Sequence, residues 1–219
     1  MTTTPPLRSD ARRNRERIVA AASELFAEHG ADLCVDEIAR RAGVGHATVF
    51  RRFPCKDDLV AAMFEQRITE AAEAVEEIAA TVRDPWDALA AAMASIAERQ
   101  ARDRGMFEAA GSACFGSPAL REARTRISAP FVDLLHRAQE AGVVRGDLTP
   151  EDVLFLITAA GHAQPCQIDI PDLWRRYLGV ILDGMRPGSA TPLPGTSPSA
   201  DEMESALQAA ARSRRSSSS

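Results

Sequence analysis

Apolar residues recur at intervals of three and four along most of this chain, and that spacing is typical of α-helices with one buried face. The pattern predicts a first helix from about Asp10 to His29 and a long helix from Lys56 to about Val82. Two shorter helices are predicted between them, over about 35–42 and 46–52, and further helices begin near 85, 118, 150 and 173. No segment alternates between apolar and polar residues as a strand does. The sequence therefore predicts an all-α fold of about nine helices.

Proline, glycine and changes in composition divide the chain into four parts. Residues 1–11 include Pro5 and Pro6 and show no periodicity, so we expect a disordered arm. Residues 12–56 hold three helices and form a small N-terminal domain, and residues 57–186 form a larger helical domain. Residues 187–219 are rich in proline, serine and glycine and are expected to be a flexible tail.

Composition favours a globular protein without a membrane segment. The chain has 219 residues, of which 45% are hydrophobic and 26% charged, and no apolar run reaches the roughly 20 residues that span a bilayer. The N-terminus has no apolar stretch, so a secretory signal peptide is not expected. The four cysteines are far apart and form no C-x-x-C pair, which favours reduced thiols over disulfides or a zinc site. We therefore expect a cytoplasmic protein.

The charge is distributed unevenly along the chain. The net charge is −5, but residues 1–56 carry ten basic and seven acidic residues, whereas the remainder carries 16 basic and 24 acidic ones. A mildly basic end on an acidic chain is compatible with a nucleic-acid contact that is confined to that end.

The most informative stretch is VDEIARRAGVGHATVFRRFPCKDDLV, residues 35–60. It predicts two short helices joined by a tight glycine turn, with a small core between them formed by Ile38, Ala39, Val44, Val49 and Phe53. This arrangement leaves an outward face of His46, Ala47, Thr48, Arg51 and Arg52. A helix with small residues at its start and arginines at its end can enter a DNA major groove. The alternative is that this charged face is merely solvated.

The same stretch resembles the N-terminal domain of the TetR (tetracycline repressor) family of transcriptional regulators. The matching positions are spread over about residues 12–70, at the spacing of the family: Phe26, Gly30, Val35, Ile38, Ala39, Ala42 to Val44, Phe50 to Phe53, Lys56 and Leu59. The resemblance implies a helix-turn-helix over 34–53 with a recognition helix over 46–52. It also implies that residues 12–56 are the DNA-binding domain and that 57–186 bind an effector and dimerise.

The resemblance further implies roles for single residues. His46 and Ala47 stand where bases are contacted, and Thr48, Arg52 and Lys56 stand where phosphates are held. With their neighbours, the implied DNA contacts are Cys34, Val35, Asp36, Gly45, His46, Ala47, Thr48, Phe50, Arg51, Arg52 and Lys56.

The chain departs from the family pattern at four positions. The family often has Tyr at Phe50, Ser at Gly45, and Thr or Ser at Cys34 and Cys55. Cys34-x-x-Glu37 then has the pattern of a capping box whose hydroxyl is replaced by a thiol. These changes predict weaker phosphate contacts on an otherwise intact basic face.

The larger domain offers a candidate effector pocket, which the resemblance implies, and a candidate dimer interface. The pocket candidates are the large apolar residues Phe64, Met93, Met106, Phe107, Phe115, Phe131 and Phe155, together with His162; the alternative is that they form ordinary core. Helices 150–164 and 172–185 have more apolar surface than one subunit can readily cover, which predicts a homodimer through these helices. The interface candidates are Leu154, Ile157, Trp174, Tyr177, Leu178 and Ile181.

The sequence contains no motif that is typical of an enzyme, a cofactor site or a metal site. It contains no glycine-rich phosphate loop, G-x-S-x-G or H-E-x-x-H, and His136 with Glu140 is typical of a surface pair rather than a metal site. We expect a ligand-responsive repressor that binds a palindromic operator as a homodimer and is released by a small hydrophobic effector. Two alternatives stay open: an architectural DNA-binding protein without an effector, and a repressor that senses redox state through Cys34 or Cys55.

Overall fold

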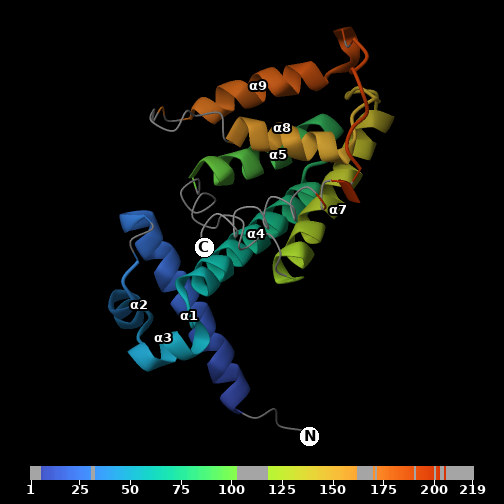
Figure 1. The fold of residues 1–219 in the computed structure, drawn as a ribbon. Helices are drawn as coiled ribbons and strands as arrows, with labels where there is room; N and C mark the ends of the chain where they lie inside the picture. Colours follow the sequence, from blue (N-terminus) through green and yellow to red (C-terminus); the bar gives the residue numbers. More distant parts are fainter. Residues whose placement is uncertain are drawn as a thin grey trace, which may run out of the picture.

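The computed structural model is all-helical in the part of the chain that it describes, which confirms the predicted fold class (Figure 1). It describes residues 6–30, 33–102, 118–161, 170, 172–189, 191–199, 201–202 and 205. The helices are α1 (Pro6–His29), α2 (Val35–Ala42), α3 (His46–Arg52), α4 (Lys56–Thr81), α5 (Pro85–Arg102), α7 (Pro118–Glu140), α8 (Pro150–Gly161) and α9 (Leu173–Met185), followed by one 3-10 turn (Pro187–Ser189). Within those ranges, none of the helices combines the length and apolar character needed to cross a membrane.

The first helix begins earlier than the sequence pattern predicts. α1 starts at Pro6, so residues 6–11 are helical rather than part of a disordered arm. Proline is well tolerated at the first position of a helix, where its missing N–H would have no partner in any case. Arg13 lies 2.8 Å from Asp10, and Arg12 lies 3.5 Å from Glu16, so charged pairs one turn apart support this end of the helix.

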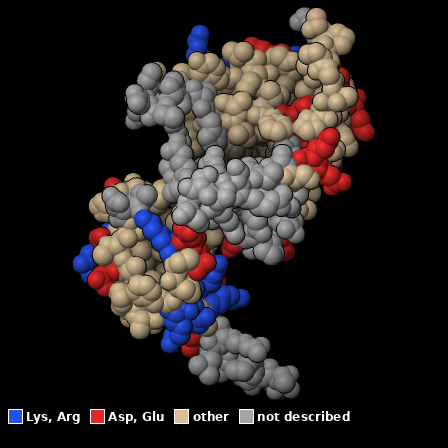
Figure 2. Space-filling model, viewed as in Figure 1, with Lys and Arg blue, Asp and Glu red and all other residues tan. Residues whose placement is uncertain are grey.

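Two separate hydrophobic cores divide the molecule into a head and a body (Figure 1). We use "head" for α1, α2, α3 and the first turns of α4, which share a core around Ile18, Leu25 and Ile38. We use "body" for the rest of α4 with α5, α7, α8 and α9, whose core contains Leu89 and Phe131. In the view of Figure 2 most of the visible Lys and Arg lie on the head, and Asp and Glu dominate the visible charges of the body.

The long helix α4 belongs to both cores. Leu59 and Met63 are buried in the head core, and Ala72 and Val75, about three turns further on, are buried in the body core. A helix of 26 residues is about 39 Å long, so a single rigid element links the two parts. The predicted helix from Lys56 to about Val82 is confirmed, with its end one residue earlier, at Thr81.

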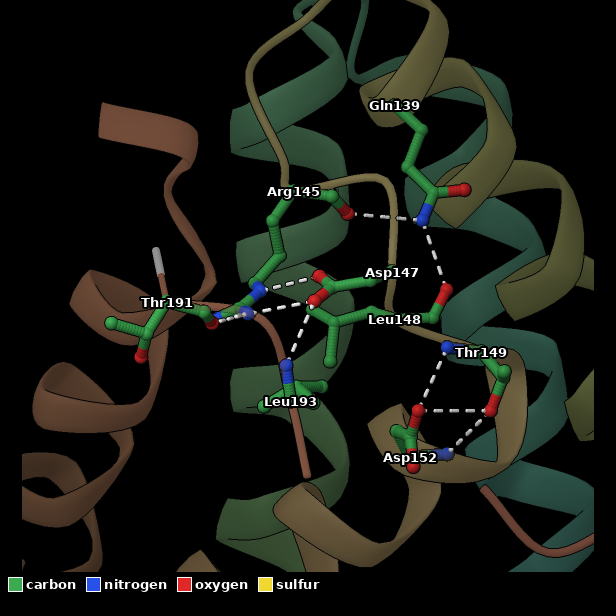
Figure 3. A network of polar contacts seen from close by, with 8 residues as sticks. All are labelled: Gln139, Arg145, Asp147, Leu148, Thr149, Asp152, Thr191 and Leu193. Atoms are coloured by element: carbon green, nitrogen blue, oxygen red, sulfur yellow. Dashed lines mark hydrogen bonds and ion pairs between the residues drawn. The ribbon is translucent and has the colours of Figure 1, made fainter. Parts of the chain in front are cut away.

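The segment that follows the last helices lies against the body rather than free of it. Ser197 Oγ donates a 2.8 Å hydrogen bond to Asp152, and the backbone N–H of Leu193 donates to Asp147 at 3.3 Å. Arg145 holds Asp147 with hydrogen bonds of 2.6 and 2.8 Å and also donates to the carbonyl of Thr191 (Figure 3). These contacts correct the prediction of a flexible tail for residues 191–199, because the turn between α7 and α8 supplies partners for their polar groups.

The start of α8 is closed by a reciprocal capping box. Asp152 N–H donates to Thr149 Oγ1 at 3.2 Å, and Thr149 N–H donates to Asp152 Oδ2 at 2.9 Å (Figure 3). Thr149 is therefore the N-cap, with Pro150 at the first helical position. The cap and the 191–199 segment share Asp152, which couples the tail to the beginning of α8.

Asp147 gives the contact between tail and body a defined pH dependence. Its hydrogen bonds with Arg145 lower the pKa of the carboxyl from 3.8 to about 2. A carboxyl whose pKa is depressed by folding stabilises the folded state above its unfolded pKa, and this contribution declines as the pH falls towards the folded pKa. We expect Asp147→Asn to lower the free energy of unfolding at pH 6, and this deficit to shrink progressively from about pH 5 towards pH 2.

Urea unfolding of the two proteins at a series of pH values measures this difference. Asp183→Asn is the matched control, because Asp183 is an exposed aspartate of α9 without a side-chain partner in the described part of the chain. A deficit that keeps its size down to pH 2.5, or none at pH 6, would contradict the role given to Asp147.

Candidate nucleic-acid interface

A glycine turn sets the angle between α2 and α3. Gly43 adopts a left-handed conformation (φ 62°), and Val44 N–H then donates to the carbonyl of Ala39 at 3.0 Å. Arg17 of α1 donates to the carbonyl of Gly43 at 3.2 Å, and a Cβ on Gly43 would come within 2.5 Å of that guanidinium. The left-handed backbone favours glycine at this position, and a Cβ here would also displace the flexible end of Arg17.

One face of α3 is buried in the head core. Val49 is 2% exposed and Phe53 is 6% exposed, and they pack with Ile38 and Ala39 of α2. Val44 of the turn packs against the same core while remaining partly exposed. Four of the five residues that the sequence predicts for this small core therefore lie in it, and the fifth, Val44, packs against it.

The opposite face of α3 points to solvent. His46, Ala47, Phe50, Arg51 and Arg52 are exposed, and Thr48 is half-buried. Within the described ranges Arg51 and Arg52 have no carboxylate partner, so their guanidinium groups are available to an anion. The residues predicted to face DNA from α3 are thus together on one surface, which lies on the part of the molecule where Lys and Arg gather (Figure 2).

Neighbouring helices hold this face rigidly. Arg41 of α2 makes hydrogen bonds of 2.7 and 2.9 Å with Glu28 of α1, and this pairing lowers the pKa of Glu28. Arg15 of α1 pairs with Glu65 of α4 at 3.3 Å, and its guanidinium lies 5.7 Å from the ring centre of Phe53. These contacts hold α2 against α1 and α1 against α4, and Arg15 also contacts the residue that ends α3.

The remaining predicted DNA contacts lie at the starts of α2, α3 and α4. Cys34, Asp36, Gly45 and Lys56 are exposed, and Val35 is half-buried against the head core. Cys34 and Cys55 occupy the N-cap positions of α2 and α4, and neither makes a side-chain cap hydrogen bond. The predicted capping box at Cys34 is therefore wrong.

The other half of that predicted box has a different partner. Glu37 pairs with Arg40 at 3.2 Å instead of reaching back to the start of α2. A thiol is a poor substitute for the hydroxyl that completes a capping box, which explains why this one does not form.

His46 has two contacts that the sequence does not reveal. Its Nε2 lies 3.2 Å from Oδ1 of Asp36, at the start of α2. Its ring centre lies 4.8 Å from that of Phe50, one turn along α3, at an interplanar angle of 61°. Only the turn at Gly43 brings the two helix starts together, so sequence spacing could not have predicted the Asp36 contact.

The pocket candidates differ in where they lie. Phe64, Met93 and Phe131 are buried, whereas Phe155 is 52% exposed on α8 and does not face the body core. Met106, Phe107, Phe115 and His162 lie outside the described residues. The prediction for Phe155 is corrected by helix geometry, because Val153, Ile157 and Ala160 form the buried face of α8 and residue 155 points away from it.

The sequence also missed one polar residue of the body. Gln100 of α5 lies against Gly161 of α8, and its buried Oε1 accepts no hydrogen bond from the part of the chain that the structure describes. No three His, Cys, Asp or Glu side chains of that part lie close enough together to hold a metal ion.

The interface candidates also divide into two groups. Ile157, Trp174 and Leu178 are at most 7% exposed and belong to the body core, so they pack within the chain rather than at a subunit interface. Tyr177 is 45% exposed, and Leu154 and Ile181 are half-buried. With the exposed Phe155 and Val180 these residues form what we call the α8–α9 apolar face: Leu154, Phe155, Tyr177, Val180 and Ile181.

Comparison with known proteins relates both parts of the chain to transcriptional regulators. Residues 18–63 match the model of bacterial regulatory proteins of the tetR family, and residues 84–187 match the model of the C-terminal domain of SbtR-like transcriptional regulators. A TetR transcription regulatory protein from Mycobacterium vanbaalenii is 34% identical, with a TM-score of 0.59 over 83% of this chain and 99% of that one.

Two further proteins are similar over different extents. The regulator FadR from Bacillus subtilis, solved in complex with stearoyl-CoA, shares the fold at 18% identity, with a TM-score of 0.60 over 80% of this chain and 98% of that one. An HTH-type transcriptional regulator from Staphylococcus aureus is 41% identical over 54 residues, which are 24% of this chain and 29% of that protein. This chain thus spans less than a third of the length of the curated relatives that it matches.

The turn at Gly43 makes a prediction about stability. We expect Gly43→Ala to lower the free energy of unfolding by about 1 kcal/mol or more, because the new Cβ occupies a left-handed backbone and meets Arg17. Gly45→Ala is the matched control, since Gly45 has an ordinary φ of −72° and a Cβ there would be 3.9 Å from Thr48. Urea unfolding measures both variants, and an equal effect at the two glycines would refute the constraint assigned to the turn.

Proposed function

Since this chain belongs to the TetR family of bacterial transcriptional regulators, we propose that it acts in the cytoplasm as a ligand-responsive repressor. In this proposal it binds a palindromic operator as a homodimer and leaves the operator when a small hydrophobic effector binds. The observation that carries the proposal is the outward face of α3, where two small residues stand beside two arginines that have no carboxylate partner among the described residues.

On DNA, α3 lies in the major groove. His46 and Ala47 at its start contact base edges, and Thr48, Arg52 and Lys56 hold phosphates. Lys56 is exposed in the first turn of α4, where the backbone N–H groups also favour an anion. The exposed side chains of Cys34 and Asp36, at the start of α2, lie at the rim of this contact surface.

A second copy of the chain covers the α8–α9 apolar face. Exposed Phe155, Tyr177 and Val180 are large apolar side chains on two helices that pack against each other, and water is a poor environment for such a surface. Packing two copies about a twofold axis brings each face against its equivalent and buries about 2,000 Å² or more.

The effector binds among the body helices. Phe64, Met93 and Phe131 are buried apolar side chains of α4, α5 and α7, which favours an apolar ligand. FadR, which shares this fold, binds stearoyl-CoA, a molecule with a long apolar chain. The chemistry of the body and that of this structural neighbour agree in favouring a hydrophobic effector.

Release from DNA depends on α4, which is packed in both the head core and the body core. An effector that prefers one arrangement of the body helices displaces the body end of α4, and the head moves with the other end. The two recognition helices of the dimer then no longer fit half-sites that are about 34–36 Å apart.

The phosphate contacts predict a uniform loss of affinity. Arg52→Ala and Lys56→Ala should each weaken binding to all DNA sequences alike, and each should lower the slope of log affinity against log salt by about 1. Fluorescence anisotropy titrations at several salt concentrations measure the slope. Arg83→Ala is the control, because Arg83 is an exposed arginine just past the body end of α4. A change in base preference at unchanged salt slope would mean that these residues read bases instead.

The dimer predicts a loss of assembly after one charge substitution. Val180→Asp should yield monomers that keep their helix content and lose operator affinity, because Val180 is 66% exposed in the single chain and its replacement disturbs no core contact. Sedimentation velocity at micromolar concentration gives the oligomeric state, with Ala20→Asp on the exposed side of α1 as the control. A wild-type monomer under these conditions would rule out the dimer.

A further inference from the structure

We propose that Asp36 helps to determine operator specificity without contacting DNA itself, by fixing the imidazole of His46 in the orientation that reads a base. This inference rests on the proposed function, since it takes α3 as the helix that enters the major groove. It assigns Asp36 the role of a positioning residue and His46 the role of the residue that reads the sequence.

Two contacts define the orientation of the imidazole. Asp36 lies in the first turn of α2, and its Oδ1 is 3.2 Å from Nε2 of His46. On another side the ring meets the edge of Phe50, with 4.8 Å between ring centres. A histidine at the start of an exposed helix otherwise samples several rotamers, and these two neighbours restrict it.

The carboxylate also decides which ring nitrogen faces DNA. A negative oxygen beside Nε2 favours a proton on that nitrogen, whether the ring is neutral or charged. Nδ1 is then the nitrogen that remains for a base edge. Because each base pair presents a distinct pattern of donors and acceptors in the major groove, a ring that offers one defined nitrogen discriminates better than a ring that can turn.

Asp36 lies in the first turn of α2 and favours the helix dipole there, but neither stability nor DNA affinity explains its contact with His46. The side chain of Asp36 is 82% exposed and that of His46 is 52% exposed, and an ion pair so open to water contributes little to the stability of the fold. A carboxylate next to the DNA surface also repels phosphates and so lowers affinity for every sequence. The geometry therefore indicates that Asp36 lowers the affinity for DNA but orients His46 for its contact with a base.

The test compares base preference in five variants of the full-length protein. The wild type is first used to select binding sites from a random-sequence duplex library. Affinities for the best duplex and for all its single-base variants are then measured for wild type, Asp36→Ala, Asp36→Asn, His46→Ala and the double variant Asp36→Ala/His46→Ala. Glu37→Ala is the matched control, since Glu37 is a carboxylate of the same helical turn that pairs with Arg40 instead of His46.

We expect His46→Ala to reduce discrimination at one position of each half-site by about tenfold, and Asp36→Ala to reduce it at the same position. Asp36→Asn, which keeps an acceptor oxygen, should restore most of that discrimination. In the His46→Ala background, Asp36→Ala should leave the base profile unchanged. Asp36→Ala and Glu37→Ala should both raise affinity for unrelated DNA, but only Asp36→Ala should alter the profile. Urea unfolding should give a similar, small loss of stability for Asp36→Ala and Glu37→Ala, because each removes an acidic side chain from the first turn of α2.

Three results would overturn the inference. An unchanged profile in Asp36→Ala would show that His46 needs no positioning, and a change at a position different from the one that His46 controls would show that Asp36 reads a base directly. A change that persists in the His46→Ala background would show the same. If the wild type selects no sequence at all, the proposed function fails together with the inference, whereas the first three results leave the proposed function intact.

Discussion

The long helix α4 is uninterrupted and is buried at its two ends in different cores, so it connects the head to the body mechanically. Near the beginning of α4, Leu59 and Met63 are buried in the core that it shares with α1, α2 and α3. In its second half, Ala72 and Val75 are buried in the core that it shares with α5 and α7. The pair Arg15–Glu65 ties the same helix to α1, and Arg126–Glu76 ties it to α7. A hydrogen-bonded helix resists bending over this length, so the orientation of the head follows that of α4.

The head is small, and its geometry depends on few contacts. The turn at Gly43 sets α3 against α2, and Val49 and Phe53 hold the inner side of α3 in the core. The outer side of α3 is not part of the core, so it can carry the exposed side chains of His46, Phe50, Arg51 and Arg52. This separation of a packed side from a polar side is what makes a seven-residue helix suitable as a probe of DNA.

The helices and the core of the head could be predicted from the sequence because the signals that define them are local. Helical periodicity, the glycine turn and the run from Phe50 to Phe53 each involve residues close together in the chain. The sequence predicted the faces of α8 and α9 less well, because these helices are apolar on more than one side. Periodicity alone could not decide that Trp174 and Leu178 are buried within the chain while Phe155 and Val180 are exposed.

Contacts between distant polar residues were beyond the reach of sequence reasoning. The pairing of Asp36 with His46 requires the relative placement of two helices, and the hydrogen bonds from residues 191–199 to Asp147 and Asp152 join positions 45 to 46 residues apart. Proline and serine in the tail favoured an irregular segment, and the segment is irregular, but its partners lie on a turn whose position only the folded body defines.

We propose that two copies of this chain present their α3 helices to DNA as a symmetric pair. Selection of binding sites by the purified wild-type protein from a random-sequence duplex library tests it most directly. A symmetric pair of α3 helices should enrich an inverted repeat whose half-sites are centred about one or two helical turns apart. Enrichment of a single unrepeated sequence, or of no sequence, would contradict it.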